Sequence, residues 1–154
     1  MLQSIYPNLL ALHGLLRWIV LAAALAAILA AASGWSGTKP ASPALRRFSI
    51  IFVSFMDLNF LLGLLLYFGA SPVTKMAFQN MAAAMKDHEL RFFSVEHTTY
   101  MFLAVVCAHV GGALARKGKT DLKKYRGAAI AFAFSLLLIL AGIPWWRPLL
   151  RIGS

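Results

Sequence analysis

The chain has 154 residues, of which 60% are hydrophobic and 13% are charged, and its mean hydropathy is +0.73. A soluble domain carries roughly a quarter charged residues, so this composition excludes an ordinary soluble core. Four membrane spans of about 20 residues each would use roughly half of the chain and leave only short connections. The sequence therefore predicts a single membrane domain over residues 1–154, without a separate extramembrane domain.

Four apolar runs have the length of a membrane-spanning helix. They lie at Leu9–Ala32, Phe48–Phe68, Val95–Ala115 and Gly127–Trp146. The first run has no basic segment before it and is longer than the apolar part of a signal peptide, so we expect a mature helix there. The predicted fold class is all-α, an integral membrane four-helix bundle.

The longest connection joins the second run to the third. Ser71 and Pro72 should end the second helix, because a residue before proline is disfavoured in the helical region. The segment from Val73 to Lys86 then places three methionines at near-helical spacings. This pattern predicts an amphipathic helix in the plane of the membrane interface, where it could cover a pocket that opens to the same face.

Basic residues outside the four runs are divided unevenly between the two sides of the predicted bundle. One side carries nine, namely Lys39, Arg46, Arg47, Arg116, Lys117, Lys119, Lys123, Lys124 and Arg126. The other side carries five, namely Lys75, Lys86, Arg91, Arg147 and Arg151. The positive-inside rule then predicts a multi-pass protein of the bacterial inner membrane, with both termini on the non-cytoplasmic side.

The net charge of +10 does not indicate nucleic-acid binding. The densest basic stretch, from Arg116 to Arg126, lies beside a predicted span and contains one aromatic residue, Tyr125, on which a base could stack. The expected contacts of this stretch are instead the anionic headgroups of the lipid bilayer.

Ionisable residues are costly in hydrocarbon, so those inside the runs are functional candidates. Those inside or beside the runs are His13, Arg17, Asp57, Asn59, Glu96, His97 and His109, with His88 and Arg91 just outside. The first and third helices run in the same direction, and His13 and His97 both lie in their first turns, at similar depth. Two facing imidazoles suit the two axial positions of a six-coordinate haem b. The chain has no Cys-x-x-Cys-His motif, so such a haem would be held noncovalently.

Arg17 and His109 complete the set of candidate residues. Arg17 follows His13 by four residues and shares its helix face, so its guanidinium could bind a haem propionate, a quinone oxygen or the carboxylate of Asp57. His109 follows His97 by twelve residues, which turns it about 120° away from that histidine. We expect His109 to be a core histidine hydrogen-bonded to Asp57 and not a metal ligand.

Several motifs resemble those of small bacterial four-helix membrane proteins that are labelled cytochrome b-like. They are Leu12–Trp18, Leu62–Phe68 with the following Ser71 and Pro72, and Leu90–His97, together with the basic stretch after the third run and the closing Ile143–Trp145. The resemblance covers nearly the whole chain. It implies a compact membrane protein that binds haem b and that belongs to a larger electron-transfer assembly.

The resemblance also implies a set of site residues. The positions that match are His13, Arg17, Arg91, Glu96 and His97. His13 and His97 would be the metal ligands, and Arg17 and Arg91 would contact the cofactor. Members of the group often carry a histidine in the second helix near the position of Asp57, and this chain has none there.

Three functions are compatible with the sequence. The first is a haem b electron carrier that acts as a subunit of a respiratory or photosynthetic complex, between a quinone and a redox partner. The second is a cofactor-free structural subunit of a larger membrane complex, and the third is a small transporter or proton path through Arg17, Asp57 and His109. The chain shows neither a repeat nor a pair of Gly/Pro-broken helices, which disfavours transport. It also lacks a paired-carboxylate or nucleophile site, so we expect an electron-transfer subunit and not a self-contained enzyme.

The uneven charge distribution predicts an orientation that a reporter fusion can measure. A protein that fluoresces only in the cytoplasm should be dark when fused after Ser154 and bright when inserted near Lys119. The reverse pattern would place His13 and His97 at the cytoplasmic face.

Overall fold

The structure is a computed structural model that describes residues 4–38 and 40–147. Within these residues all regular elements are helical: α1 (Tyr6–Ala32), α2 (Pro43–Leu65), η1 (Leu66–Ala70), α3 (Pro72–Gln79), α4 (Met81–Ala84), α5 (His88–Arg91), η2 (Phe92–Glu96), α6 (His97–Lys117) and α7 (Asp121–Gly142). The elements η1 and η2 are single π-helical stretches that continue α2 and connect α5 to α6. Four continuous helices of the described chain are therefore long and apolar enough to cross a membrane: Tyr6–Ala32, Pro43–Ala70, His88–Lys117 and Asp121–Gly142.

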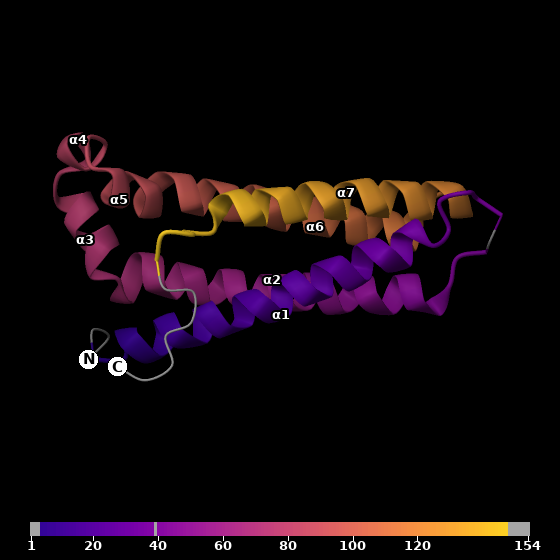
Figure 1. The fold of residues 1–154 in the computed structure, drawn as a ribbon, viewed down its shortest axis with the longest axis horizontal. Helices are drawn as coiled ribbons and strands as arrows, with labels where there is room; N and C mark the ends of the chain where they lie inside the picture. Colours follow the sequence, from indigo (N-terminus) through magenta and orange to yellow (C-terminus); the bar gives the residue numbers. More distant parts are fainter. Residues whose placement is uncertain (1–3, 39, 148–154) are drawn as a thin grey trace.

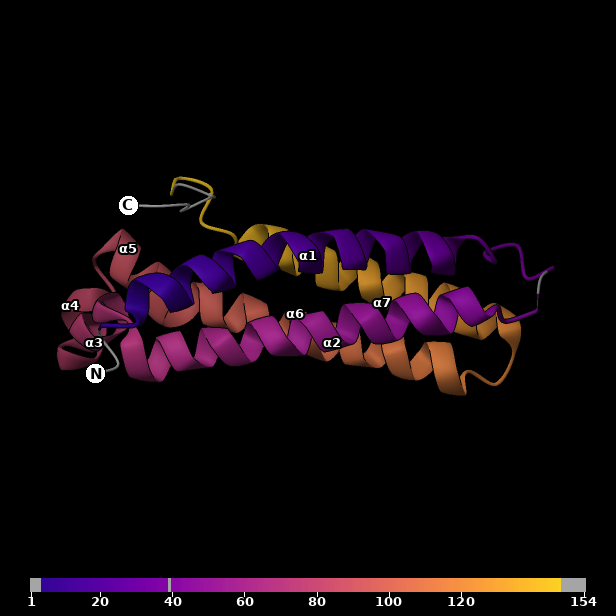
Figure 2. The same cartoon turned by 90° about the horizontal axis from the view of Figure 1, so that it is seen from below.

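The four long helices form a bundle in which each packs against two neighbours. Helix α1 packs against α2 and α7, and helix α6 also packs against α2 and α7. Helices α1 and α6 therefore occupy opposite corners. The short helices α3, α4 and α5 lie together at one end of the bundle, and the connections from α1 to α2 and from α6 to α7 lie at the other end (Figures 1 and 2).

Helix ends differ from the predicted boundaries because polar caps extend beyond the apolar runs. Helix α2 begins at Pro43, where the Ser42 hydroxyl accepts a hydrogen bond of 3.2 Å from the Leu45 amide. Helix α7 begins at Asp121 after a Thr120 cap and so includes Lys123 and Lys124, which were predicted to lie in the loop. The predicted end of the fourth helix at Trp146 is wrong. The backbone becomes extended at Ile143, the residue before Pro144.

Small and aromatic residues form the centre of the bundle. Alanines of α1, α6 and α7 are fully buried and let these helices approach closely, as small residues do between membrane helices. The rings of Phe52 on α2 and Phe132 on α7 meet edge to face with their centroids 5.4 Å apart. The Ser135 hydroxyl donates a hydrogen bond of 2.8 Å to the carbonyl of Ala104, which satisfies a buried polar group between α6 and α7.

The connection between the second and third long helices is helical, as predicted, but not continuous. Helices α3 and α4 meet at Asn80, whose backbone is not helical (φ −149°, ψ 87°). The side-chain oxygen of Asn80 accepts a hydrogen bond of 3.0 Å from the Ala83 amide and so starts α4. Met76, Met81 and Met85 are exposed on this segment.

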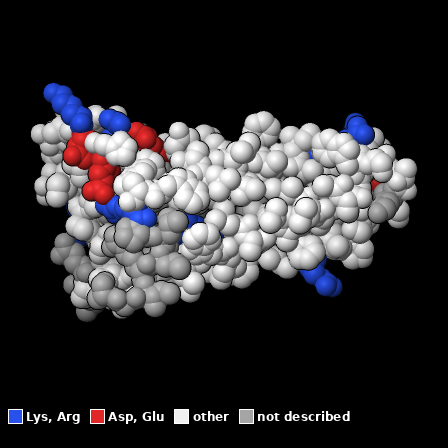
Figure 3. Space-filling view, in the orientation of Figure 1, with Lys and Arg blue, Asp and Glu red and all other residues white. Residues whose placement is uncertain are grey.

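Charged side chains gather at the two ends of the molecule, and the long middle of the face shown in Figure 3 is almost uncharged. The end that carries α3 to α5 holds three of the five acidic residues, Asp87, Glu89 and Glu96. Of the basic residues counted in the sequence, Lys39 and Arg151 lie outside the described residues.

Close packing between α6 and α7 predicts that one glycine cannot be replaced. A Cβ atom built on Gly111 would lie 2.5 Å from the ring of Phe132, whereas a Cβ on Gly14 would meet nothing within 4 Å. Gly111→Ala should therefore destabilise the protein by about 1–3 kcal/mol through overpacking. Gly14→Ala, the matched control, should not lower stability. Thermal unfolding in detergent measures both, and equal melting temperatures for the two variants would contradict the packing described.

Candidate functional site

A cavity of about 610 Å³ opens between the long helices, near the end of the bundle that carries α3 and α5. Its wall is mostly apolar, with a few polar side chains that converge on it. Its polar and aromatic lining residues include His13, Arg17, Asn59, Tyr67, Phe93 and His97. A volume of this size is typical of cofactor and small-molecule sites, which lie between helices in bundles.

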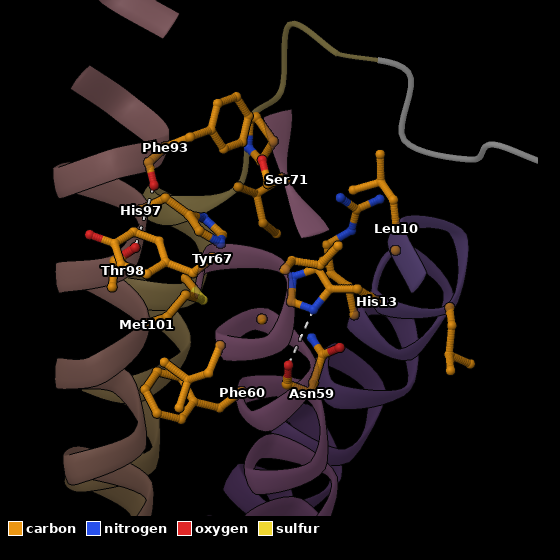
Figure 4. A pocket seen from close by; sticks show the side chains of 18 of the residues that line it. Leu10, His13, Asn59, Phe60, Tyr67, Ser71, Phe93, His97, Thr98 and Met101 are labelled. Atoms are coloured by element: carbon orange, nitrogen blue, oxygen red, sulfur yellow. Dashed lines mark hydrogen bonds between the residues drawn. The ribbon is translucent and has the colours of Figure 1, made fainter. Parts of the chain in front are cut away.

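The two predicted ligand histidines face one another in this cavity. His13 on α1 and His97 at the start of α6 come from opposite corners of the bundle, and their ring centroids are 6.3 Å apart with 75° between the ring planes. Figure 4 shows both imidazoles inside the cavity, each turned towards the other. The prediction that they lie at matching depth is confirmed.

Each imidazole is held by a backbone carbonyl. His13 Nδ1 lies 3.2 Å from the Asn59 carbonyl oxygen, and His97 Nδ1 lies 2.7 Å from the Gly142 carbonyl oxygen. A carbonyl oxygen can only accept, so each Nδ1 carries the proton and donates. Each Nε2 is then the nitrogen with the free lone pair. Metal-bound histidines have this arrangement, in which the second nitrogen donates to a carbonyl and fixes the tautomer.

The local backbone makes both carbonyls accessible to the histidines. Gly142 is the last residue of α7, and the final carbonyls of a helix have no partner within it. Asn59 lies inside α2, and the residue one turn later is Gly63. A Cβ atom on Gly63 would lie 3.3 Å from His13 Cε1, closer than ordinary contact. The glycine therefore leaves a notch over the Asn59 carbonyl in which the His13 ring fits.

The spacing of the two rings suits a metal between them. A metal bound by two imidazole nitrogens at about 2 Å each separates the ring centroids by about 6 Å, and the observed separation is 6.3 Å. Among the described residues, no group of three or more His, Cys, Asp or Glu side chains could hold a metal. Two imidazoles are the number of protein ligands that iron in a macrocycle requires.

Two π-helical stretches border the cavity, and sequence analysis did not predict them. Tyr67 of η1 and Phe93 of η2 line the cavity, and His97 directly follows η2. The Tyr67 hydroxyl donates a hydrogen bond of 2.7 Å to the Ser94 carbonyl, which ties η1 to η2. The Phe93 ring lies 6.1 Å from the His97 ring. Single π-helical turns inside α-helices occur frequently at functional sites, and no hydropathy pattern marks them.

The segment after α7 lines the cavity with Ile143, Pro144 and Arg147 and contacts α5 and η2. Arg147 forms an ion pair with Glu89, and its guanidinium carbon lies 4.3 Å from the centre of the Phe93 ring. Trp146 packs against Phe92 and His88, with ring centroids 4.6 and 4.9 Å away. Arg147 also lines the cavity. In the sequence analysis, Arg147 served only to predict the orientation in the membrane and was not identified as a residue of the site.

The other predicted residues are placed differently. Arg17 lines the cavity, and its guanidinium carbon lies 5.4 Å from the Trp18 ring centre. Arg91 is not among the residues that line the cavity, because its Nε donates to Glu96 Oε1 at 2.7 Å. The structure therefore brings together three of the four predicted site residues, namely His13, Arg17 and His97.

The expected bond between His109 and Asp57 is confirmed, at 2.9 Å between Nε2 and Oδ1. The expectation that His109 is a core histidine is wrong, because its side chain is 52% exposed on the outside of the bundle. Asp57 was one of three partners considered for Arg17. In the structure Arg17 lines the cavity and Asp57 bonds to His109, and the ion pairs between described residues do not include Arg17 with Asp57.

Comparisons of the chain with protein families, with curated proteins and with solved structures found no match.

Proposed function

We propose that the chain is a haem b protein of the membrane, in which His13 and His97 are the two axial ligands of the iron. The observation that supports this proposal is that the ring centroids of the two imidazoles lie 6.3 Å apart inside the cavity. Both rings donate from Nδ1 to a backbone carbonyl and keep Nε2 for a ligand bond. Haem b bound there would supply reversible one-electron transfer.

We further propose that the four long helices cross the bacterial inner membrane with both termini on the non-cytoplasmic side. Their length and apolar composition, and the nearly uncharged middle of the molecule, support insertion. The larger number of basic residues at the end with the α1–α2 and α6–α7 connections supports the orientation. The segment of α3 and α4, with its exposed methionines, would lie in the opposite interface.

The chain's own residues would hold the macrocycle in several ways. The carbonyls of Asn59 and Gly142 orient the axial rings, and the apolar wall excludes water. Arg17 lines the cavity, and a guanidinium can bind a carboxylate such as a propionate with paired hydrogen bonds. Arg147 also lines the cavity but forms an ion pair with Glu89, so it would contribute positive charge near the macrocycle. We leave Arg91 out of the set because it bonds to Glu96 and does not reach the cavity.

In this proposal the protein acts as a subunit of a respiratory or photosynthetic electron-transfer assembly. The cavity lies near one end of the bundle, so a redox partner at that membrane face would be close to it. A quinone is a suitable partner in the membrane, since its carbonyl oxygens accept hydrogen bonds from groups such as Arg17. A proton path through Arg17, Asp57 and His109 is less well supported, because Arg17 lines the cavity whereas the bonded pair of Asp57 and His109 lies outside it.

Substitution of the histidines tests the ligand assignment. His13→Ala and His97→Ala should each abolish the low-spin haem spectrum of the purified protein, because iron loses one of its two axial ligands. His109→Ala is the matched control and should keep the spectrum, since its imidazole bonds to Asp57 outside the cavity.

Two results would contradict the proposal. One is loss of the haem signal in His109→Ala alone, which would place the cofactor elsewhere in the bundle. The other is a wild-type protein that carries no haem when it is purified from cells supplied with haem, which would favour the cofactor-free structural subunit. Thermal unfolding of each variant establishes that it has folded.

A further inference from the structure

The most exposed part of the cavity wall lies on α1. Of the described residues that line the cavity, Leu12 and Leu15 are exposed, at 44% and 54%, and the others are buried or half-buried. A residue that lines a cavity and is also exposed lies at its mouth. The cavity therefore reaches the outer surface of the bundle beside these two leucines.

Gly14 lies between these leucines in the sequence and also lines the cavity. A Cβ atom built on Gly14 would meet nothing within 4 Å, whereas a Cβ on Gly63, at the inner wall, would lie 3.3 Å from His13. The space beside Gly14 is therefore open, and a large group attached there would occupy it. We call the surface formed by Leu12, Gly14 and Leu15 the α1 mouth.

Packed residues cover the cavity at the nearby end of the bundle. Ser71 and Thr74 line the cavity from the start of α3, and both are buried. The Thr74 hydroxyl donates a hydrogen bond of 2.7 Å to the carbonyl of Tyr67, which holds α3 against η1. Ile143, in the segment after α7, lines the cavity and is buried as well. A route from the water at this end would have to displace these packed and hydrogen-bonded residues.

The α1 mouth lies at a depth where hydrocarbon and not water would surround the helix. Helix α1 has 27 residues and is about 40 Å long, so about 5 Å would project from each side of a hydrocarbon core about 30 Å thick. Leu12 and Leu15 follow Tyr6 by six and nine residues, which places them about 9 and 14 Å along the helix. In a centrally placed helix both leucines are then inside the hydrocarbon, about 4–9 Å below its surface.

We propose that the ligand of the cavity enters and leaves sideways, between the lipid and the cavity, through the α1 mouth. Haem b is a flat and largely apolar molecule, so it partitions into a bilayer and would meet the apolar rim of Leu12 and Leu15 there. Arg17 follows Gly14 by three residues, shares its face of α1 and lines the cavity, so a cation lies close to the mouth for the haem carboxylates. The inference rests on the proposed function, both haem binding and membrane insertion, and adds the route of the ligand.

Blocking the mouth after the protein has folded tests this route. With Cys107→Ser as background, Gly14→Cys allows a maleimide with a bulky aromatic group to be attached in liposomes. The labelled protein should acquire the low-spin spectrum from haemin in the bilayer about tenfold more slowly than the same protein without label, because the barrier to passage rises. It should also lose haem to an added haem-binding apoprotein more slowly by the same factor. A blocked route slows both directions equally, so the final haem content should not change.

Leu25→Cys in the same background is the matched control. Leu25 is exposed on α1 but is not among the described residues that line the cavity, so the same label there should change neither rate. The unlabelled Gly14→Cys protein establishes that this variant folds and binds haem before it is blocked. Gly14→Trp and Leu25→Trp repeat the comparison without a chemical label, and only Gly14→Trp should slow the two rates.

Specific results would overturn the proposal. Equal rates for the proteins labelled at positions 14 and 25 would show that the ligand uses another route. A lower final haem content with an unchanged rate of entry would show that position 14 contacts the ligand and does not lie on its path. Either result with a full low-spin spectrum in the unlabelled protein would contradict this inference alone. An unlabelled protein that never acquires the spectrum would contradict the haem assignment, and this inference with it.

Discussion

The hydrogen bonds from two imidazole Nδ1 atoms to backbone carbonyls determine what this cavity can do. They hold His13 to Asn59 and His97 to Gly142, so each ring is anchored to a helix other than its own. Both anchors are main-chain atoms, which cannot rotate away as side chains can. As a result, the two rings face one another across the bundle with their centroids 6.3 Å apart, and each keeps Nε2 for a ligand. Without these bonds the two histidines would be free to adopt other rotamers.

The early end of α7 makes this arrangement possible. Pro144 forces Ile143 out of the helix, so the carbonyl of Gly142 is left without a helical partner and becomes available to His97. The chain then continues along the cavity, where Arg147 contacts Glu89 and Phe93. The end of this helix thus supplies both the carbonyl that holds His97 and a second guanidinium in the cavity lining.

The sequence predicts this fold better than it predicts the site. Hydropathy identifies four long helices because apolar composition is what a bilayer requires, and depth along parallel helices correctly brought His13 and His97 together. Depth alone says nothing about direction around a helix, so it left Asp57 open as a partner of Arg17 and did not place His109 on the outside of the bundle, where it bonds to Asp57. Three features of the site depend on backbone geometry, which the pattern of hydrophobic residues does not predict. They are the space beside Gly63, the two π-helical stretches and the accessible carbonyl of Gly142. Hydropathy also does not detect a polar first turn that follows an N-cap residue, as at the start of α7.

The central claim is that these two histidines bind one haem b between them. The most direct measurement is the haem content per chain of the purified wild-type protein, determined by extraction of the haem and combined with a reduced-minus-oxidised spectrum. The account predicts one haem b per chain with a low-spin spectrum, since both axial positions are occupied by imidazole. Protein that contains no haem, and that acquires no low-spin spectrum when haemin is added to it in detergent, would contradict the account.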